Sequence, residues 1–257
     1  MPGDLAQRYR SPSQKVRVVS EAWGAANLYC VSCPSTSVVP LPNNTKAIDF
    51  RCARCGSRYQ LKSQGRPLTS HIMDAGYFAM REAIIRNLTP SIFALHYDPI
   101  RWRAQGLVII PHFVLSLSCV ARRNPLRPSA RRHGHVLCNI LLSSIPPDAR
   151  IRLISEGTPV EPDQVREQYA RLRPLEGIGY EARGWALDVL NVVRLLGKRE
   201  FTLGEVYAHE EMLLRLHPAN RFVRPKIRQQ LQRLRDMGLV SFRARGRYET
   251  VTGIRLN

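Results

Sequence analysis

Two pairs of cysteines have the spacing of a metal site. Each pair has the form Cys-x2-Cys, and the pairs comprise Cys30, Cys33, Cys52 and Cys55. Four thiolates on two such turns can close a tetrahedral site around Zn²⁺. Because they leave no open coordination position, we expect a structural zinc knuckle over residues 30–55 and assign that metal no catalytic role. A disulfide or a redox-active pair explains four matched cysteines less well.

Asp49 lies between the cysteine pairs, and the tripeptide Gln60-Leu61-Lys62 follows the second pair. On adjacent strands, an acidic residue, a second oxygen ligand and a lysine can surround one phosphodiester. The oxygen ligands would bind Mg²⁺, which lowers the pKa of an attacking water, and the lysine would stabilise developing negative charge. A capping aspartate and an exposed lysine would give the same pattern, so these residues alone leave both interpretations open.

The segments around these residues predict an α/β domain with a mixed central sheet. Apolar spacing favours helices at residues 14–23 and 72–86, and extended segments at 46–50, 59–62, 91–96, 107–111 and 150–155. We expect this domain to occupy residues 1–178. Residues 174–183, with Pro174, Gly177 and Gly179, are the expected linker.

The C-terminal residues 184–257 have the pattern of a winged helix-turn-helix domain. Thr202 and Glu205 fit a capping box, Pro225 suits a first helical turn, and Gly238 suits a helix end. The expected elements are helices at 184–196, 203–216 and 226–237, then strands at 239–243 and 248–254.

The charge of the chain indicates a polyanionic partner. Lys and Arg number 39 against 20 Asp and Glu, a formal net charge of +19. Nucleic acid is the natural partner for such a surplus, with an anionic membrane surface as the alternative. Residues 122–132 alone carry five arginines and no acid, as a surface loop along phosphates would.

The chain shows neither a membrane-spanning run nor a signal-like N-terminus, so we expect a cytoplasmic protein in a reducing compartment. Cys119 and Cys138, in apolar surroundings, are then expected to be buried thiols.

The third predicted helix of the C-terminal domain would read DNA. Its N-terminal side chains would face base edges in the major groove, where arginine suits guanine and glutamine suits adenine. Arginines of the wing would contact phosphates, and Leu231 and Leu234 would be core. The expected contacts are Lys226, Arg228, Gln229 and Gln230 on the helix, with Arg243, Arg245 and Arg247 on the wing. One of the two glutamines is equally explained as plain helix surface.

The whole chain resembles the DpnI family of restriction endonucleases, which cut DNA methylated on adenine. The likeness is carried by Ser13-Gln14-Lys15, Trp23, Tyr29-Cys30 with the other three knuckle cysteines, Asp49-Phe50, Leu61-Lys62-Ser63, Ala130-Arg131-Arg132, Cys138-Asn139-Ile140, Arg183-Gly184-Trp185, Glu200-Phe201-Thr202-Leu203, Lys226-Ile227-Arg228-Gln229-Gln230-Leu231-Gln232 and Leu234-Arg235-Asp236. The resemblance implies a PD-(D/E)xK nuclease core with a zinc knuckle, followed by a winged helix.

By the resemblance, Asp49, Gln60 and Lys62 fall on the catalytic positions, with Asp49 and Gln60 binding Mg²⁺, and the four cysteines fall on zinc ligands. The second acidic position holds Gln60, whose amide oxygen can coordinate Mg²⁺ without a carboxylate's charge. Mrr-like nucleases resemble this arrangement. Glu21 or Asp74 are the candidates for supplying another carboxylate.

His135 is the other departure from the family. It stands where the family's type member has a tryptophan that helps hold the methylated base, just after the arginine pair Arg131 and Arg132, which we also expect to contact DNA. A histidine ring can still stack or hydrogen-bond.

These features predict a type II, methyl-directed endonuclease for double-stranded DNA, acting at adenine-methylated GATC, with both domains reading the site and no oligomer required. The alternatives are a nuclease of the same fold with an altered methyl requirement or none, and a DNA-binding regulator whose nuclease site has decayed.

Overall fold

The computed structural model describes residues 1–42, 45, 47–129 and 132–251. The chain packs as two compact units, each built from several chain segments. Unit 1 comprises Met1–Met73, Leu88–His112 and Arg150–Ala170, and unit 2 comprises Asp74–Asn87, Phe113–Ala149 and Arg171–Asn257.

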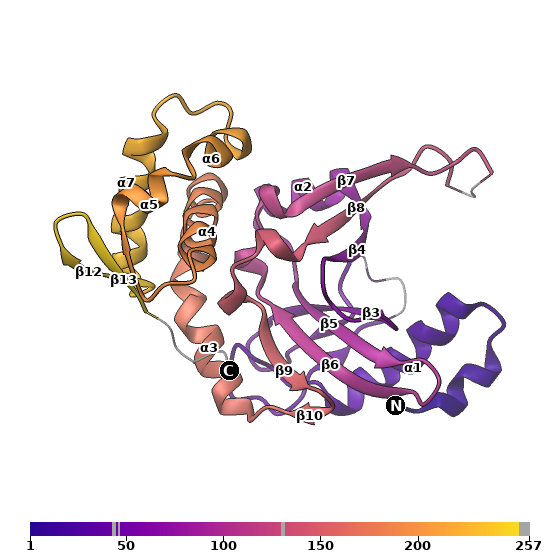
Figure 1. The fold of residues 1–257 in the computed structure, drawn as a ribbon. Helices are drawn as coiled ribbons and strands as arrows, with labels where there is room; N and C mark the ends of the chain where they lie inside the picture. The colour runs from indigo at the N-terminus through magenta and orange to yellow at the C-terminus, as the bar shows by residue number, and fades with distance from the viewer. Residues whose placement is uncertain (43–44, 46, 130–131, 252–257) are drawn as a thin grey trace. The chain divides into compact units, whose positions relative to one another are not determined.

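Unit 1 is built on a seven-stranded sheet of order β1-β2-β3-β5-β6-β9-β10 (Figure 1). Only the β3–β5 pairing is parallel among the strand pairs described in this sheet, so the sheet is mixed. The strands are β1 Val39–Pro40, β2 Phe50–Arg51, β3 Arg58–Gln64, β5 Ser91–Asp98, β6 Arg103–Ile110, β9 Ile151–Ser155 and β10 Thr158–Pro159. Strand β5 is buried over most of its length, as expected for a strand covered on both faces.

Helix α1, Pro12–Asn27, packs closely on this sheet. A Cβ on its Gly24 would lie 2.9 Å from Phe50 Cζ and 3.3 Å from Leu61 Cδ2, so the helix approaches β2 and β3 only because that residue is glycine. Unit 1 also holds the 3₁₀ helix η1, Gly3–Arg8, and most of helix α3, Pro162–Leu172.

The prediction of a helix over residues 72–86 is correct only for the second part of that range. Residues His71–Gly76 form strand β4, and helix α2 runs from Tyr77 to Ile85. Strand β4 lies at one edge of a three-stranded sheet of order β4-β8-β7. The pairing partner, β8, is distant in the sequence, and local apolar spacing carries no information about it.

In unit 2, strands β7, Val120–Pro125, and β8, Val136–Leu141, form an antiparallel hairpin with α2 packed beside it (Figure 1). Arg122 and Arg123 are exposed residues of β7, so part of the expected basic loop is strand. Short 3₁₀ helices connect these elements: η2 His112–Val114, η3 Leu117–Cys119, η4 Leu142–Ser144, η5 Pro147–Ala149 and η6 Arg173–Gly177. Cys119 and Cys138 are fully buried thiols that form no disulfide, as predicted.

The C-terminal part of unit 2 has the elements of a winged helix: α4 Tyr180–Leu195, β11 Glu200–Thr202, α5 Leu203–Tyr207, α6 Glu210–Leu216, α7 Val223–Asp236, β12 Val240–Ala244 and β13 Arg247–Thr250. The capping box at Thr202 and Glu205 is present, and Gly238 follows α7 with a φ of 73°. The expected second helix is divided into α5 and α6, and α7 begins at Val223, before Pro225. The additional strand β11 pairs with β13.

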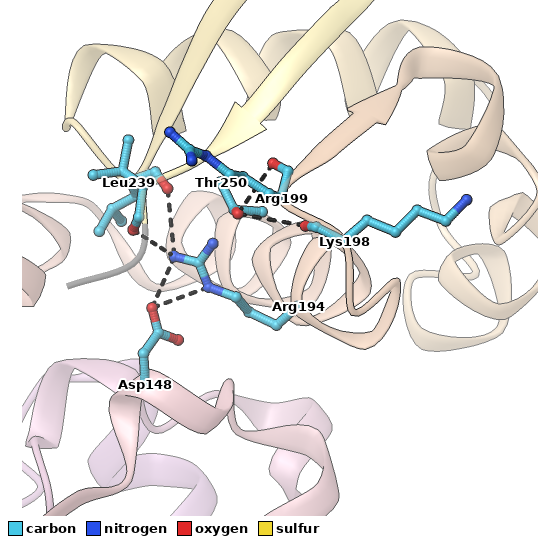
Figure 2. Close-up of polar contacts among 7 residues, drawn as sticks. Asp148, Arg194, Lys198, Arg199, Leu239 and Thr250 are labelled. Carbon is cyan, nitrogen blue, oxygen red and sulfur yellow. Dashed lines mark hydrogen bonds and ion pairs between the residues drawn. The ribbon is translucent and has the colours of Figure 1, made fainter. Parts of the chain in front are cut away.

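A buried arginine ties the last strands to the rest of unit 2 (Figure 2). Arg194 of α4 donates to Asp148 Oδ2 from Nε at 3.0 Å and from Nη2 at 2.8 Å. Its Nη2 also approaches the carbonyls of Leu239 at 3.4 Å and Val251 at 3.5 Å. Beside it, the Thr250 hydroxyl donates to the carbonyl of Arg199 at 3.2 Å.

The fold class predicted from the sequence is confirmed: a mixed α/β chain with a seven-stranded sheet, a four-cysteine knuckle and a C-terminal helical domain. Among the residues that the structure describes, no helix combines the length and apolar character needed to cross a bilayer.

Candidate functional site

The four knuckle cysteines converge in unit 1. The Sγ atoms of Cys30, Cys33, Cys52 and Cys55 all lie within 4.8 Å of one another. Cys30 is 3.6 Å from Cys55, and Cys33 is 3.6 Å from Cys52, between sulfur atoms. Four sulfurs each about 2.3 Å from one tetrahedral ion lie about 3.8 Å apart. The cluster therefore has the dimensions to hold Zn²⁺.

A backbone turn favours the thiolate form of Cys52, whereas burial raises the pKa values of Cys30 and Cys33. The amide of Cys52 donates to the Ser57 carbonyl at 2.9 Å, and Gly56 takes the positive φ of 74° that the turn requires. Burial opposes ionisation of Cys52, but hydrogen bonds from the backbone amides of Cys55 and Arg54 and from the Cys30 and Cys33 thiols together outweigh it, and the pKa of this thiol falls to about 6. Thiolates are the form that binds metal.

Arg166 of α3 supports the first knuckle, a role that sequence reasoning missed. Its Nε donates to the carbonyls of Cys30 at 3.3 Å and Cys33 at 3.2 Å, and its Nη2 donates to Ser35 at 3.2 Å. Its guanidinium also stacks over the Tyr29 ring at 5.2 Å from the centroid. Only the fold brings this distant arginine to the knuckle, since nothing in the local sequence marks it.

Asp49 directly precedes β2 and is hydrogen-bonded to β3. The register pairs Phe50 with Tyr59, and Asp49 lies just beyond the Phe50 end of the paired residues. The Asp49 amide donates to the Tyr59 carbonyl at 2.9 Å, and Asp49 Oδ2 accepts from the Leu61 amide at 2.7 Å. These bonds hold the carboxylate at the junction of the two strands.

Lys62 lies two residues beyond Gln60 on β3, so the two side chains leave the same face of the strand. Tyr59 and Leu61 leave the other face, where Leu61 meets α1 and the Tyr59 ring stacks on Phe93 at 5.0 Å. The apolar side chains of β3 therefore face α1 and Phe93. The half-buried side chains of Gln60 and Lys62 lie on the other face of the strand.

Glu21 of α1 is electrostatically linked to Asp49. Burial raises the pKa of Glu21, Arg17 acts in the opposite direction, and the charge of Asp49 raises it further. The other candidate carboxylate, Asp74, lies on β4 and belongs to unit 2, whereas Asp49, Gln60 and Lys62 belong to unit 1.

Helix α7 presents some of its expected DNA contacts and buries another. Arg228 and Gln229 are exposed and Lys226 is half-buried. Gln230 is 0% exposed, and its Oε1 accepts from Arg233 Nη1 at 2.9 Å. A side chain in this position supports the helix and is not offered to solvent. Leu231 and Leu234 are core, as predicted.

The other expected DNA contacts lie on the wing and on the β7–β8 hairpin. Arg245 and Arg247 are exposed, whereas Arg243 pairs with Glu249. On the hairpin, Arg132 and His135 are exposed. Arg131 lies outside the described residues.

Two family models match this chain in succession. The model of the DpnI, or Dam-replacing, family matches residues 1–177, and that of the Dam-replacing helix-turn-helix domain matches residues 181–250. The chain belongs to the DpnI family. Membership agrees with the knuckle, the mixed sheet and the C-terminal helical domain, and it confirms the resemblance given by the sequence. It supports a nuclease of the restriction type that depends on DNA methylation, and the helix-turn-helix domain points to DNA as the partner.

Proposed function

We propose that this protein is a Mg²⁺-dependent type II endonuclease that hydrolyses phosphodiester bonds in adenine-methylated double-stranded DNA at GATC sites. The observation that carries the proposal is the hydrogen bond from the Leu61 amide to Asp49 Oδ2 in a DpnI-family chain. It brings the Asp49 carboxylate to the segment of β3 from which Gln60 and Lys62 leave on one face.

Each residue of this cluster would have a distinct task. The carboxylate of Asp49 and the amide oxygen of Gln60 would hold Mg²⁺. When bound, this ion supplies Lewis acidity toward a phosphoryl oxygen and lowers the pKa of a bound water. Lys62 would stabilise negative charge on the phosphate oxygens or orient the water. The hydrogen bond from the Leu61 amide would fix the orientation of Asp49 throughout.

The cysteine cluster would hold a structural Zn²⁺. Four thiolates leave no position for a substrate or water, and the knuckle adjoins the active strands through Cys52, which follows β2 directly. Zinc would therefore stabilise the turn that joins β2 to β3, at the end of the pair opposite Asp49.

We propose that both predicted domains, residues 1–178 and 184–257, read the DNA. In the winged helix, Lys226, Arg228 and Gln229 would approach base edges, and the wing arginines Arg245 and Arg247 would contact phosphates. Arg131, Arg132 and His135 would contact DNA in the first domain. A pocket that requires the N6-methyl group would reject bare adenine.

The test is digestion of adenine-methylated and unmethylated plasmid in the presence of Mg²⁺. We expect the parent chain to cut only the methylated plasmid. Lys62→Met should cut at least about 100-fold more slowly while retaining DNA binding, and Lys15→Met, a lysine of α1, should cut at the parent rate.

Each alternative has its own outcome in this assay. Cutting of both plasmids would favour a nuclease without a methyl requirement. If the parent chain bound DNA and cut neither plasmid, the protein would be a DNA-binding regulator, and Gln60→Glu would then show whether the missing carboxylate is the cause.

A further inference from the structure

Helix α2 of unit 2 carries an aromatic residue on its outer side. Met80 and Ile84 are the buried residues of this helix. Phe78, two positions before Met80 and so nearly opposite it around the helix, is 62% exposed. Because most of the Phe78 side chain is exposed, it contributes little to the stability of the core. Its ring is available to a binding partner.

An arginine faces this ring, and another faces the aromatic ring beside it. The guanidinium of Arg122, on strand β7, lies 6.0 Å from the Phe78 ring centroid. The neighbouring Tyr77 ring is 5.3 Å from Phe78 in an edge-on arrangement, and Arg81 lies 5.7 Å from the Tyr77 centroid. The acidic residue of α2, Glu82, is paired with Arg86 at 2.8 Å. The surface therefore combines exposed aromatic area with positive charge.

The same surface adjoins His135. Gly76 caps the N-terminus of α2, and a Cβ built on it would lie 3.5 Å from the Cε1 and Nε2 atoms of the His135 ring. The ring of His135 therefore lies against Gly76, the residue that directly precedes Tyr77 and Phe78. Strand β7 contributes Arg122, His135 directly precedes β8, and α2 contributes the two aromatic residues (Figure 1).

We propose that Phe78 is a stacking wedge for DNA: its ring enters a base step of the bound duplex while Arg122 and Arg81 face the flanking phosphates. Aromatic side chains stack on bases of any sequence because every base has a π-face, and apolar wedges inserted at a base step kink the duplex. The arginines match the polyanion that must surround such a base. Helix α2 would thus add the Phe78 ring to the small ring of His135, and the two together would offer a larger aromatic area for stacking on a base.

The inference deepens the proposed function, since it assumes that the chain binds duplex DNA, but it does not assume cleavage. The experiment measures binding of an adenine-methylated GATC duplex that carries 2-aminopurine at positions around the site. The full chain is used in a Lys62→Met background with Mg²⁺, so that the duplex stays intact. The fluorescence of 2-aminopurine rises when the base loses its stacking neighbours.

We expect the Phe78 parent to raise the fluorescence at one step, and Phe78→Ala to abolish that rise and weaken binding about tenfold. Phe78→Trp should retain both properties. Ile85→Ala, which removes a 41% exposed apolar side chain from the end of the same helix, is the matched control and should match the parent. Circular dichroism would verify that each variant is folded.

The proposal is overturned if Phe78→Ala binds and unstacks the base as the parent does, or if Ile85→Ala is equally impaired. It is also overturned if the folded parent binds no duplex. Failure of the nuclease proposal is separately visible: a chain that binds and unstacks DNA through Phe78 but cuts no plasmid retains this inference and loses the other.

Discussion

The ion pair between Arg194 and Asp148 should contribute strongly to the stability of unit 2 (Figure 2). The Arg194 side chain is 7% exposed and that of Asp148 is 38% exposed. Asp148→Ala would leave a guanidinium buried with only the Leu239 and Val251 carbonyls, at 3.4 and 3.5 Å. Removing one partner of a fully buried pair costs about 3–5 kcal/mol.

Because Asp148 is partly solvated, we expect a smaller loss in the free energy of unfolding, about 2–3 kcal/mol. For a chain of this size that corresponds to a decrease of about 7 °C in the melting temperature. The measurement is urea or thermal unfolding followed by circular dichroism.

Two further variants distinguish the effect of burying a charge on stability from the effect of the ion pair itself. Arg194→Met removes the buried charge and leaves a carboxylate that water can reach, so it should cost less than Asp148→Ala. Asp163 pairs with Arg166 at 3.0 Å but is 98% exposed. Its alanine variant should therefore lose at most about 0.5 kcal/mol. Equal effects of Asp148→Ala and Asp163→Ala would refute the argument that burial sets the magnitude.

Three other predictions concern acid, metal and salt. Hydrogen bonds from the Lys198 amine and from the amide and hydroxyl of Thr202 hold the pKa of Glu205 at about 2, below its usual 4.5. The ionised Glu205 carboxylate therefore stabilises the fold above pH 4.5, and this contribution is lost as pH falls toward 2. Glu205→Gln should flatten the dependence of melting temperature on pH between these two values. Chelation of zinc should lower the melting temperature of the parent chain. The Cys52→Ser variant should have a lowered melting temperature that a chelator no longer changes. If chelation changes neither the unfolding nor the zinc content of the parent chain, the zinc proposal is contradicted. Arg245→Ala should weaken DNA binding and reduce the slope of log K against log salt by about 1, whereas an unchanged slope in a titration series would remove this arginine from the phosphate contacts.

Features with local causes could be predicted from the sequence. The capping box at Thr202 depends on residues three apart, and the structure shows both of its hydrogen bonds. The two Cys-x2-Cys turns are likewise local, and only the meeting of the pairs required the fold. The four sulfur atoms do cluster, so the spacing of the cysteines was sufficient to predict a four-cysteine site.

Features with distant causes could not. Residues His71–Gly76 form a strand because β8 lies beside them, although their apolar spacing also suited a helix. Gln230 was expected on the surface of α7, but its partner Arg233 and its complete burial depend on how α7 packs. The roles of Asp49, Gln60 and Lys62 stay predictions, since register brings the strands together but does not measure catalysis.

Helix α4 shows why the winged helix cannot be treated as an isolated module. All residues from Arg183 to Val193 are buried, whereas the first helix of a free-standing domain would keep a solvated face. Its polar side chains instead bind segments of unit 2 that precede the predicted linker: Arg183 donates to Asn87 at 3.1 Å, Asp188 accepts from Ser118 at 2.7 Å, and Asn191 donates to the Ser143 carbonyl at 3.0 Å.

A chain cut between residues 178 and 184 would therefore separate Asp188 from Ser118 and Asn191 from Ser143, and it would expose the face of α4 that they cover. Burying a polar group without its partner costs about 1–3 kcal/mol for each group. Loss of DNA binding on deleting residues 184–257 would then reflect damaged packing as much as lost contacts. Because the β7–β8 hairpin, α2 and the wing all belong to one packing unit, single substitutions of exposed side chains such as Phe78 and Arg245 are the changes that can assign DNA contacts to each surface.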